Sequence, residues 1–158
     1  MSRYQEIRFR GVVKQEFREE FDLIAIGGRW KESSDKILRA FGNVFWEAQN
    51  IPIAARDCSR NVKRWNETPW ERSWDKETGV WQFQIAMNVN SFNFWYHFEE
   101  EILPYLMESV EHYEVWQEPL ENKPHDETTL FMQLTDGKWG EIGFFGEDGT
   151  YQPKDREK

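Results

Sequence analysis

The sequence predicts an α+β fold, with about four to five strands in an antiparallel sheet, two N-terminal helices and one long acidic amphipathic helix packed on one face. Three observations support this prediction. Several segments alternate apolar and polar residues, as half-buried strands do. Others repeat apolar residues every three or four positions, as helices do. The order strand, helix, helix, strand, long helix, hairpin favours helices gathered on one face of the sheet.

The first half of the chain predicts one strand and two helices. Residues 4–13 alternate between apolar and charged side chains, so we expect a strand. Residues 14–26 place apolar side chains at helical spacing and are followed by two glycines, which stop a helix. A second helix carries an apolar stripe from Ile37 to Phe45 and is weakened at Gly42.

The second half predicts a strand, the long helix and a hairpin. Residues 81–89 alternate most clearly, with one apolar and one uncharged polar face. The long helix follows and is expected to reach about Trp116, with a kink or restart at Pro104. Two final strands, 128–134 and 138–145, are joined by a Thr-Asp-Gly turn.

Length and composition indicate a single domain over residues 1–151, followed by a frayed polar tail at 152–158. Apolar residues make up only 39% of the 158 residues, but 16% are aromatic, so large rings can supply the core. The least regular segment is 53–72, where tryptophans stand among charges. We expect an edge strand or a loop there.

Charge and apolar runs exclude several classes of function. Twenty Lys and Arg against 29 Asp and Glu give a net charge of -9, which disfavours duplex nucleic acid as a partner. No apolar run approaches the roughly 20 residues of a membrane span, and the N-terminus lacks the apolar core of a signal peptide. We therefore expect a cytoplasmic protein that has no membrane partner and needs no cofactor.

The charge is divided unevenly along the chain. Residues 1–75 hold 14 of the 20 cations and 12 of the 29 acids, so the acidity lies in the second half. No Lys or Arg occurs between Glu77 and Asn122. On the predicted long helix, uncompensated acids would repel one another, and a basic partner would relieve that repulsion. A solvated surface is the competing interpretation.

These features lead to one principal functional hypothesis. We expect a non-enzymatic protein-interaction module, of the immunity or inhibitor type, that binds a basic protein partner. Nine tryptophans are more than the core of a domain of this size needs, so some of them should be partly exposed as interface anchors. The expected partner-binding residues are Glu100, Glu101, Glu108, Glu111, Glu114 and Glu118, together with Trp65, Trp70 and Trp74.

Two further classes remain open. A small-molecule-binding protein or hydrolase would have an aromatic-lined pocket at Trp81, Phe83 and Trp95. A homodimeric structural protein would pair the basic first half of one copy with the acidic second half of the other. A pocket with converging polar groups would favour the small-molecule class, whereas a filled core would favour the interaction module.

Chemical motifs are sparse. His97 with Glu101, and Glu108 with His112, have the i, i+4 spacing at which two side chains of a helix could share a metal ion, but a simple ion pair or a histidine near a helix N-terminus is the favoured explanation. Cys58 stands near two arginines that would favour a thiolate, whereas a lone cysteine is commonly a small buried hydrophobe. We therefore expect no metal site and assign no catalytic residue.

Overall fold

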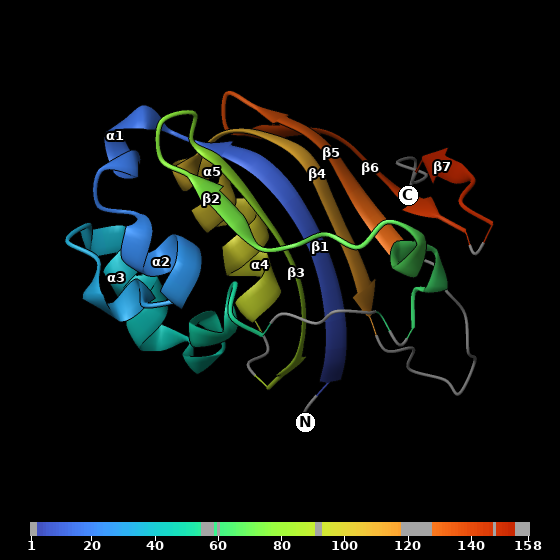
Figure 1. Ribbon diagram of the computed structural model, residues 1–158, viewed down its shortest axis with the longest axis horizontal. Coiled ribbons are helices and arrows are strands. Elements are labelled where there is room, and N and C mark those ends of the chain that lie inside the picture. Colours follow the sequence, from blue (N-terminus) through green and yellow to red (C-terminus); the bar gives the residue numbers. More distant parts are fainter. Residues whose placement is uncertain are drawn as a thin grey trace.

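The computed structural model describes residues 3–54, 59, 61–90, 93–117, 128–146 and 148–153. Its centre is a strongly twisted, seven-stranded antiparallel sheet with strand order β2-β3-β1-β4-β5-β6-β7 (Figure 1). The strands are β1 (Arg3–Val13), β2 (Ser73–Asp75), β3 (Val80–Val89), β4 (Met107–Gln117), β5 (Thr128–Thr135), β6 (Lys138–Phe145) and β7 (Tyr151–Pro153). The strand β1 therefore lies between two strands that are distant from it in sequence.

The helices are short. They are α1 (Gln15–Arg18), α2 (Asp22–Gly27), η1 (Trp30–Glu32), α3 (Lys36–Val44), η2 (Trp46–Asn50), η3 (Lys63–Glu67), α4 (Phe94–His97), the π-helical η4 (Phe98–Ile102) and α5 (Leu103–Leu106). The last three form one continuous stretch behind the sheet, and α1, α2 and α3 gather at the side of β2 (Figure 1). No helix within the described ranges is long and apolar enough to cross a membrane.

The predicted long helix is wrong. The chain is helical only to Leu106 and then continues as β4, which pairs with β1. Two register shifts in this pairing leave Glu108 and Glu111 without a partner residue in β1. Each bulge adds one residue, so the buried Met107, Val110 and Tyr113 recur every three positions on a strand. That spacing imitates the period of a helix.

The other parts of the fold prediction need correction as well. Four to five strands were expected, but the sheet has seven, because β2 and β7 are three-residue strands and β4 replaces half of a helix. The helix expected over 14–26 is broken into α1 and α2. Two residues of the expected tail, Gln152 and Pro153, belong to β7, and residues 154–158 lie outside the described part. The alternating segments and the final hairpin are confirmed as β1, β3, β5 and β6.

The core lies between the sheet and the helices. Phe9 of β1 stacks on Phe83 of β3, with ring centroids 4.9 Å apart, and also contacts Tyr113 of β4 at 6.1 Å. Trp30 and Phe41 continue this packing into the helical layer, with centroids 5.2 Å apart. Large aromatic rings thus fill the core, although only a modest fraction of the residues is apolar.

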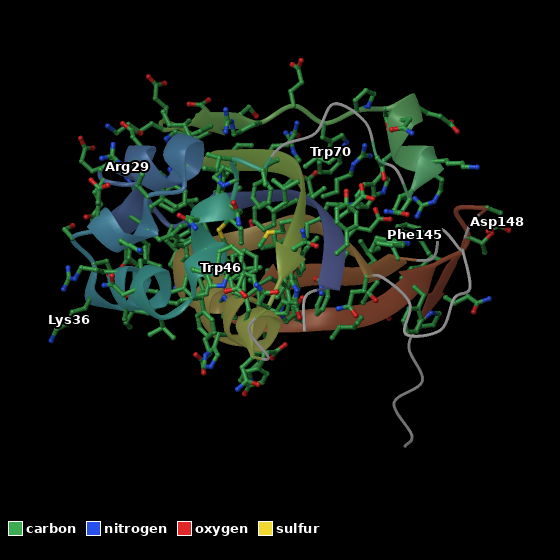
Figure 2. All side chains as sticks on the ribbon, turned by 90° about the horizontal axis from the view of Figure 1, so that it is seen from below. Arg29, Lys36, Trp46, Trp70, Phe145 and Asp148 are labelled. Atoms are coloured by element: carbon green, nitrogen blue, oxygen red, sulfur yellow. The ribbon has the colours of Figure 1, made fainter. Side chains whose placement is uncertain are left out.

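The opposite face of the sheet is crossed by residues 63–72, which we call the strap. It runs from η3, beside β5, across β4 and β1 to the start of β2 (Figure 1). Seen from below, Trp70 lies on the strap side of the sheet, whereas Lys36 lies out at the helical end of the molecule (Figure 2). The sheet is therefore covered by helices on one face and by the strap on the other.

Candidate functional site

Arg8 fastens the strap to the centre of the sheet. Its guanidinium donates to Oε1 of Gln84 at 3.0 and 2.8 Å, and to the strap carbonyls of Trp65 and Thr68 at 2.8 and 2.7 Å. It also lies over the rings of Trp65 and Trp70, 5.1 and 4.8 Å from their centroids. Burial lowers the pKa of Arg8 to about 10, so the group stays charged at neutral pH. The contacts around Arg8 hold the strap in place.

Glu114 makes a second attachment. Its carboxylate accepts hydrogen bonds from Arg64 of the strap at 2.9 Å and from Thr128 at 2.5 Å, and it lies 2.9 Å from Nε2 of His112. Burial alone would raise the pKa of Glu114, but the hydrogen bonds from His112, Thr128 and Arg64 outweigh it and lower the pKa to about 2. Only 2% of the side chain is exposed, so Glu114 is enclosed in the molecule.

The three predicted tryptophan anchors lie in different surroundings. Trp65 is only 1% exposed, so the expectation that its ring is partly exposed is wrong. Trp70 is partly exposed and packs against the ring of His112 at 5.0 Å. Trp74 is also partly exposed and donates its Nε1 proton to Asp22 at 2.8 Å. The structure does not bring the three together as one surface.

The prediction that Glu114 binds a partner is wrong, because it is enclosed and paired with Arg64, and two more of the predicted partner-binding acids are paired within the chain. Glu111 forms an ion pair with Arg10 at 3.0 Å, and Glu108 lies 3.8 Å from Arg18. Both arginines belong to the first half of the sequence, which meets the second half because β1 pairs with β4. The prediction that these acids repel one another along a helix is therefore wrong, because on the bulged strand they have cationic neighbours.

The remaining predicted acids fall into two groups. Glu100 and Glu101 are exposed on η4, whereas Glu118 lies outside the described residues. Cys58, the candidate thiolate, also lies outside them. Glu101 lines a hollow in the surface, which makes this part of the molecule the strongest candidate for a binding site.

That hollow is a groove between two antiparallel helical segments. The hydroxyl of Tyr105 donates a 2.7 Å hydrogen bond to Asp35 at one end, and the rings of Phe45 and His97 are 5.2 Å apart at the other. Phe41 packs between these ends against Phe98, with centroids 6.0 Å apart. The groove has a volume of about 550 Å³ and opens to solvent between α3 and the α4–η4 stretch.

One wall of the groove is an apolar row on α3. Ile37, Ala40 and Val44 all line the groove and face solvent, with Ile37 48% and Val44 70% exposed. Leu38 and Phe41 are buried on the inner side of the same helix. At 100° per residue, the apolar side chains of α3 span roughly 160°, more than one packing face requires. The sequence held this signal in the width of the stripe, and sequence reasoning missed it.

The other wall is polar. Nδ1 of His97 lies 2.5 Å from Oε1 of Glu101, which confirms that this i, i+4 pair is in contact. The second pair, Glu108 and His112, does not meet, because four residues of a strand span about 13 Å. Among the described residues, no group of three or more metal-ligating side chains occurs. The His97–Glu101 pair is therefore an ion-pair or hydrogen-bond contact that borders the groove.

Glu99 faces the sheet from the same π-helical turn. Its Oε2 accepts a 2.8 Å hydrogen bond from the hydroxyl of Tyr113, and its backbone carbonyl accepts one of 3.0 Å from Nε1 of Trp139. Burial raises the pKa of Glu99 to about 8, although the bond from Tyr113 opposes that shift. Sequence reasoning did not single out Glu99, because three consecutive glutamates do not reveal which of them faces inward.

Comparison with known proteins adds no relative to this picture. No protein-family model, no curated protein and no solved structure matches the chain.

Proposed function

We propose that this protein is a non-catalytic protein-interaction module that binds a basic protein partner in the groove between α3 and η4. The observation that supports it is the solvent-exposed apolar row of Ile37, Ala40 and Val44. A helix at the surface of a monomer ordinarily turns polar residues outward, and contiguous apolar surface beside polar residues marks interaction sites. The partner would bury this row.

Charge supports a basic partner. The chain carries a net charge of -9, and the exposed Glu101 lines the groove on the wall opposite α3, next in sequence to the exposed Glu100, whereas Lys36 lines it on the α3 side. Such a field attracts and orients a cationic partner before contact. Of the acids predicted to bind it, these two remain in the proposal, with His97 beside Glu101, whereas Glu108, Glu111 and Glu114 already have arginines of the same chain beside them.

The two other functional classes have less support. Trp81 and Phe83 are fully buried in the core, and neither of the two cavities described for this chain is lined by them or by Trp95. The aromatic pocket expected for a small-molecule site would need these residues at its surface. A homodimer was expected because cations and acids are separated along the sequence, but the first-half arginines pair with second-half acids within one chain.

Selection from an unbiased displayed-peptide library against the full chain tests the proposal. We expect enriched peptides that bind the wild type and that bind the Val44→Glu variant at least about tenfold more weakly. The matched control is Ile26→Glu, since Ile26 is an apolar helix residue, 56% exposed, that does not line the groove. The proposal is wrong if no peptide is enriched, or if the enriched peptides bind Val44→Glu as tightly as the wild type.

A further inference from the structure

The geometry of the groove restricts the conformation of its occupant. Its walls are α3 and the antiparallel α4–η4–α5 stretch, in contact at both ends through Tyr105 with Asp35 and Phe45 with His97. Two antiparallel helices with an apolar seam between them offer the position that a third helix fills in a bundle. An extended segment would lay unpaired backbone N–H and C=O groups on apolar side chains, at a cost in free energy.

The exposed row sets the length of the contact. Ile37 and Val44 are seven residues apart on α3, which corresponds to roughly 10 Å along the helix axis. A partner helix of two to three turns covers that distance. Its own contact face then needs apolar residues at positions i, i+3 or i+4, and i+7.

The polar wall sets the charge of the occupant. Glu100 and Glu101 are exposed on η4, and Glu101 borders the groove directly. A helix seated on the apolar row would turn one flank toward Glu101, while Lys36 lines the groove on the α3 side. Lys or Arg on that flank would be attracted, and Glu or Asp would be repelled.

A second copy of this chain is the less favoured occupant. Each copy carries a charge of -9, so two copies repel each other over long range. A basic segment is attracted by the same field. Charge complementarity therefore favours a partner of opposite sign.

We infer that the groove binds an amphipathic α-helix of two to three turns, with an apolar i, i+3/i+4, i+7 face and Lys or Arg on the flank that meets η4. This inference rests on the proposed function and adds the class of partner. Specificity comes from the carboxylates of Glu100 and Glu101, and affinity comes from burial of the α3 row.

Three synthetic peptides of about 14 residues test the inference by fluorescence anisotropy with the full chain. The first is an Ala-based helix with Leu on one face and Lys on both flanks. The second replaces Lys with Glu, and the third keeps Lys but has two central prolines. We expect the first to bind at least about tenfold more tightly than either of the others.

Variants of the protein locate the binding. Val44→Glu adds a negative charge, so non-specific attraction of the Lys peptide would increase, whereas docking in the groove predicts at least about tenfold weaker binding. Ile26→Glu adds the same charge outside the groove and serves as the control. The double change Glu100→Gln and Glu101→Gln should shrink the preference for the Lys peptide over the Glu peptide. Thermal denaturation of each variant confirms that it is folded.

The outcomes separate the inference from the proposed function. Equal binding of the helical and proline peptides overturns the helical occupant, and an unchanged Lys preference in the double variant overturns the role of the carboxylates. Either result leaves groove docking intact. If Val44→Glu weakens the binding of none of the peptides, both the inference and the proposed function are wrong. If the wild type sediments as a dimer and Val44→Glu as a monomer, the occupant is a second copy and the inference is wrong.

Discussion

The hydroxyl of Tyr113 donates a 2.8 Å hydrogen bond to Oε2 of Glu99 and so connects β4 to the π-helical turn η4. Tyr113 is fully buried, and its ring stacks on Trp139 with centroids 5.9 Å apart. Trp139 in turn donates to the backbone carbonyl of Glu99. These contacts attach the wall that carries Glu100 and Glu101 to the sheet.

Glu99→Gln should change how stability depends on pH. In the folded state the pKa of Glu99 is about 8, raised by burial from 4.5, so its contribution to stability is full below pH 4.5 and is lost as pH rises through 8. Glutamine keeps an acceptor for Tyr113 and does not ionise. Urea denaturation should give the variant a free energy of unfolding above that of the wild type at pH 9, with the gain shrinking toward pH 4.

The exposed Glu67→Gln is the control for this experiment, and it should retain the pH dependence of the wild type. If Glu99→Gln and the wild type lose stability in parallel between pH 5 and 9, Glu99 is not the group responsible.

Glu114→Gln should destabilise the protein most at neutral pH. Because the pKa of Glu114 is lowered from 4.5 to about 2, its stabilising contribution is present above pH 4.5 and is lost as pH falls through about 2. Removing one charge from this buried group leaves Arg64 without its partner, at a cost of about 3 kcal/mol at pH 7. Denaturant unfolding at pH 7 and pH 2 measures both limits.

Glu111→Gln is the matched control on the same strand. Glu111 pairs with Arg10 at the surface, so its loss should cost at most about 1 kcal/mol. Equal losses for the two variants would contradict the distinction between the buried and the exposed ion pair.

Arg8→Lys should loosen the strap. A single ammonium cannot reproduce the planar guanidinium, which reaches Gln84 and two strap carbonyls while lying over the rings of Trp65 and Trp70. We expect a loss of roughly 2–3 kcal/mol in stability and faster hydrogen exchange at strap amides. Arg10→Lys, on the exposed part of the same strand, should leave strap exchange unchanged, and a similar rate in both variants would argue against this role of Arg8.

Gly42→Ala should destabilise the protein although alanine is the better helix former. A Cβ at this position would lie 2.6 Å from the backbone nitrogen of Lys31 and 2.7 Å from Cβ of Trp30. The overlap is expected to cost about 1–3 kcal/mol net of the gain in helix propensity. Thermal unfolding should show a lower midpoint temperature for this variant, whereas the exposed Asn43→Ala should not lower the midpoint. A higher midpoint for Gly42→Ala would disprove the close approach of α3 to η1.

Local patterns predicted the elements whose stability is local. Alternation was sufficient for β1 and β3, because each strand has one face in the core. The final hairpin followed from its turn, where Asp136 and Gly137 adopt φ values of 50° and 76°, the positive angles that a tight hairpin turn needs. The candidate site was only partly predicted: Glu100 and Glu101 were named, but the α3 row beside them was not.

The charge partition of the sequence marks the limit of what the sequence determined. By itself it determined an acidic, aromatic-rich chain with cations in the first half and acids in the second. Only the tertiary structure decided which acids keep partners, because β1 pairs with β4 and brings Arg10 to Glu111, while the strap brings Arg64 to Glu114. Strand pairing joins residues about a hundred positions apart, and no local spacing of residues encodes it.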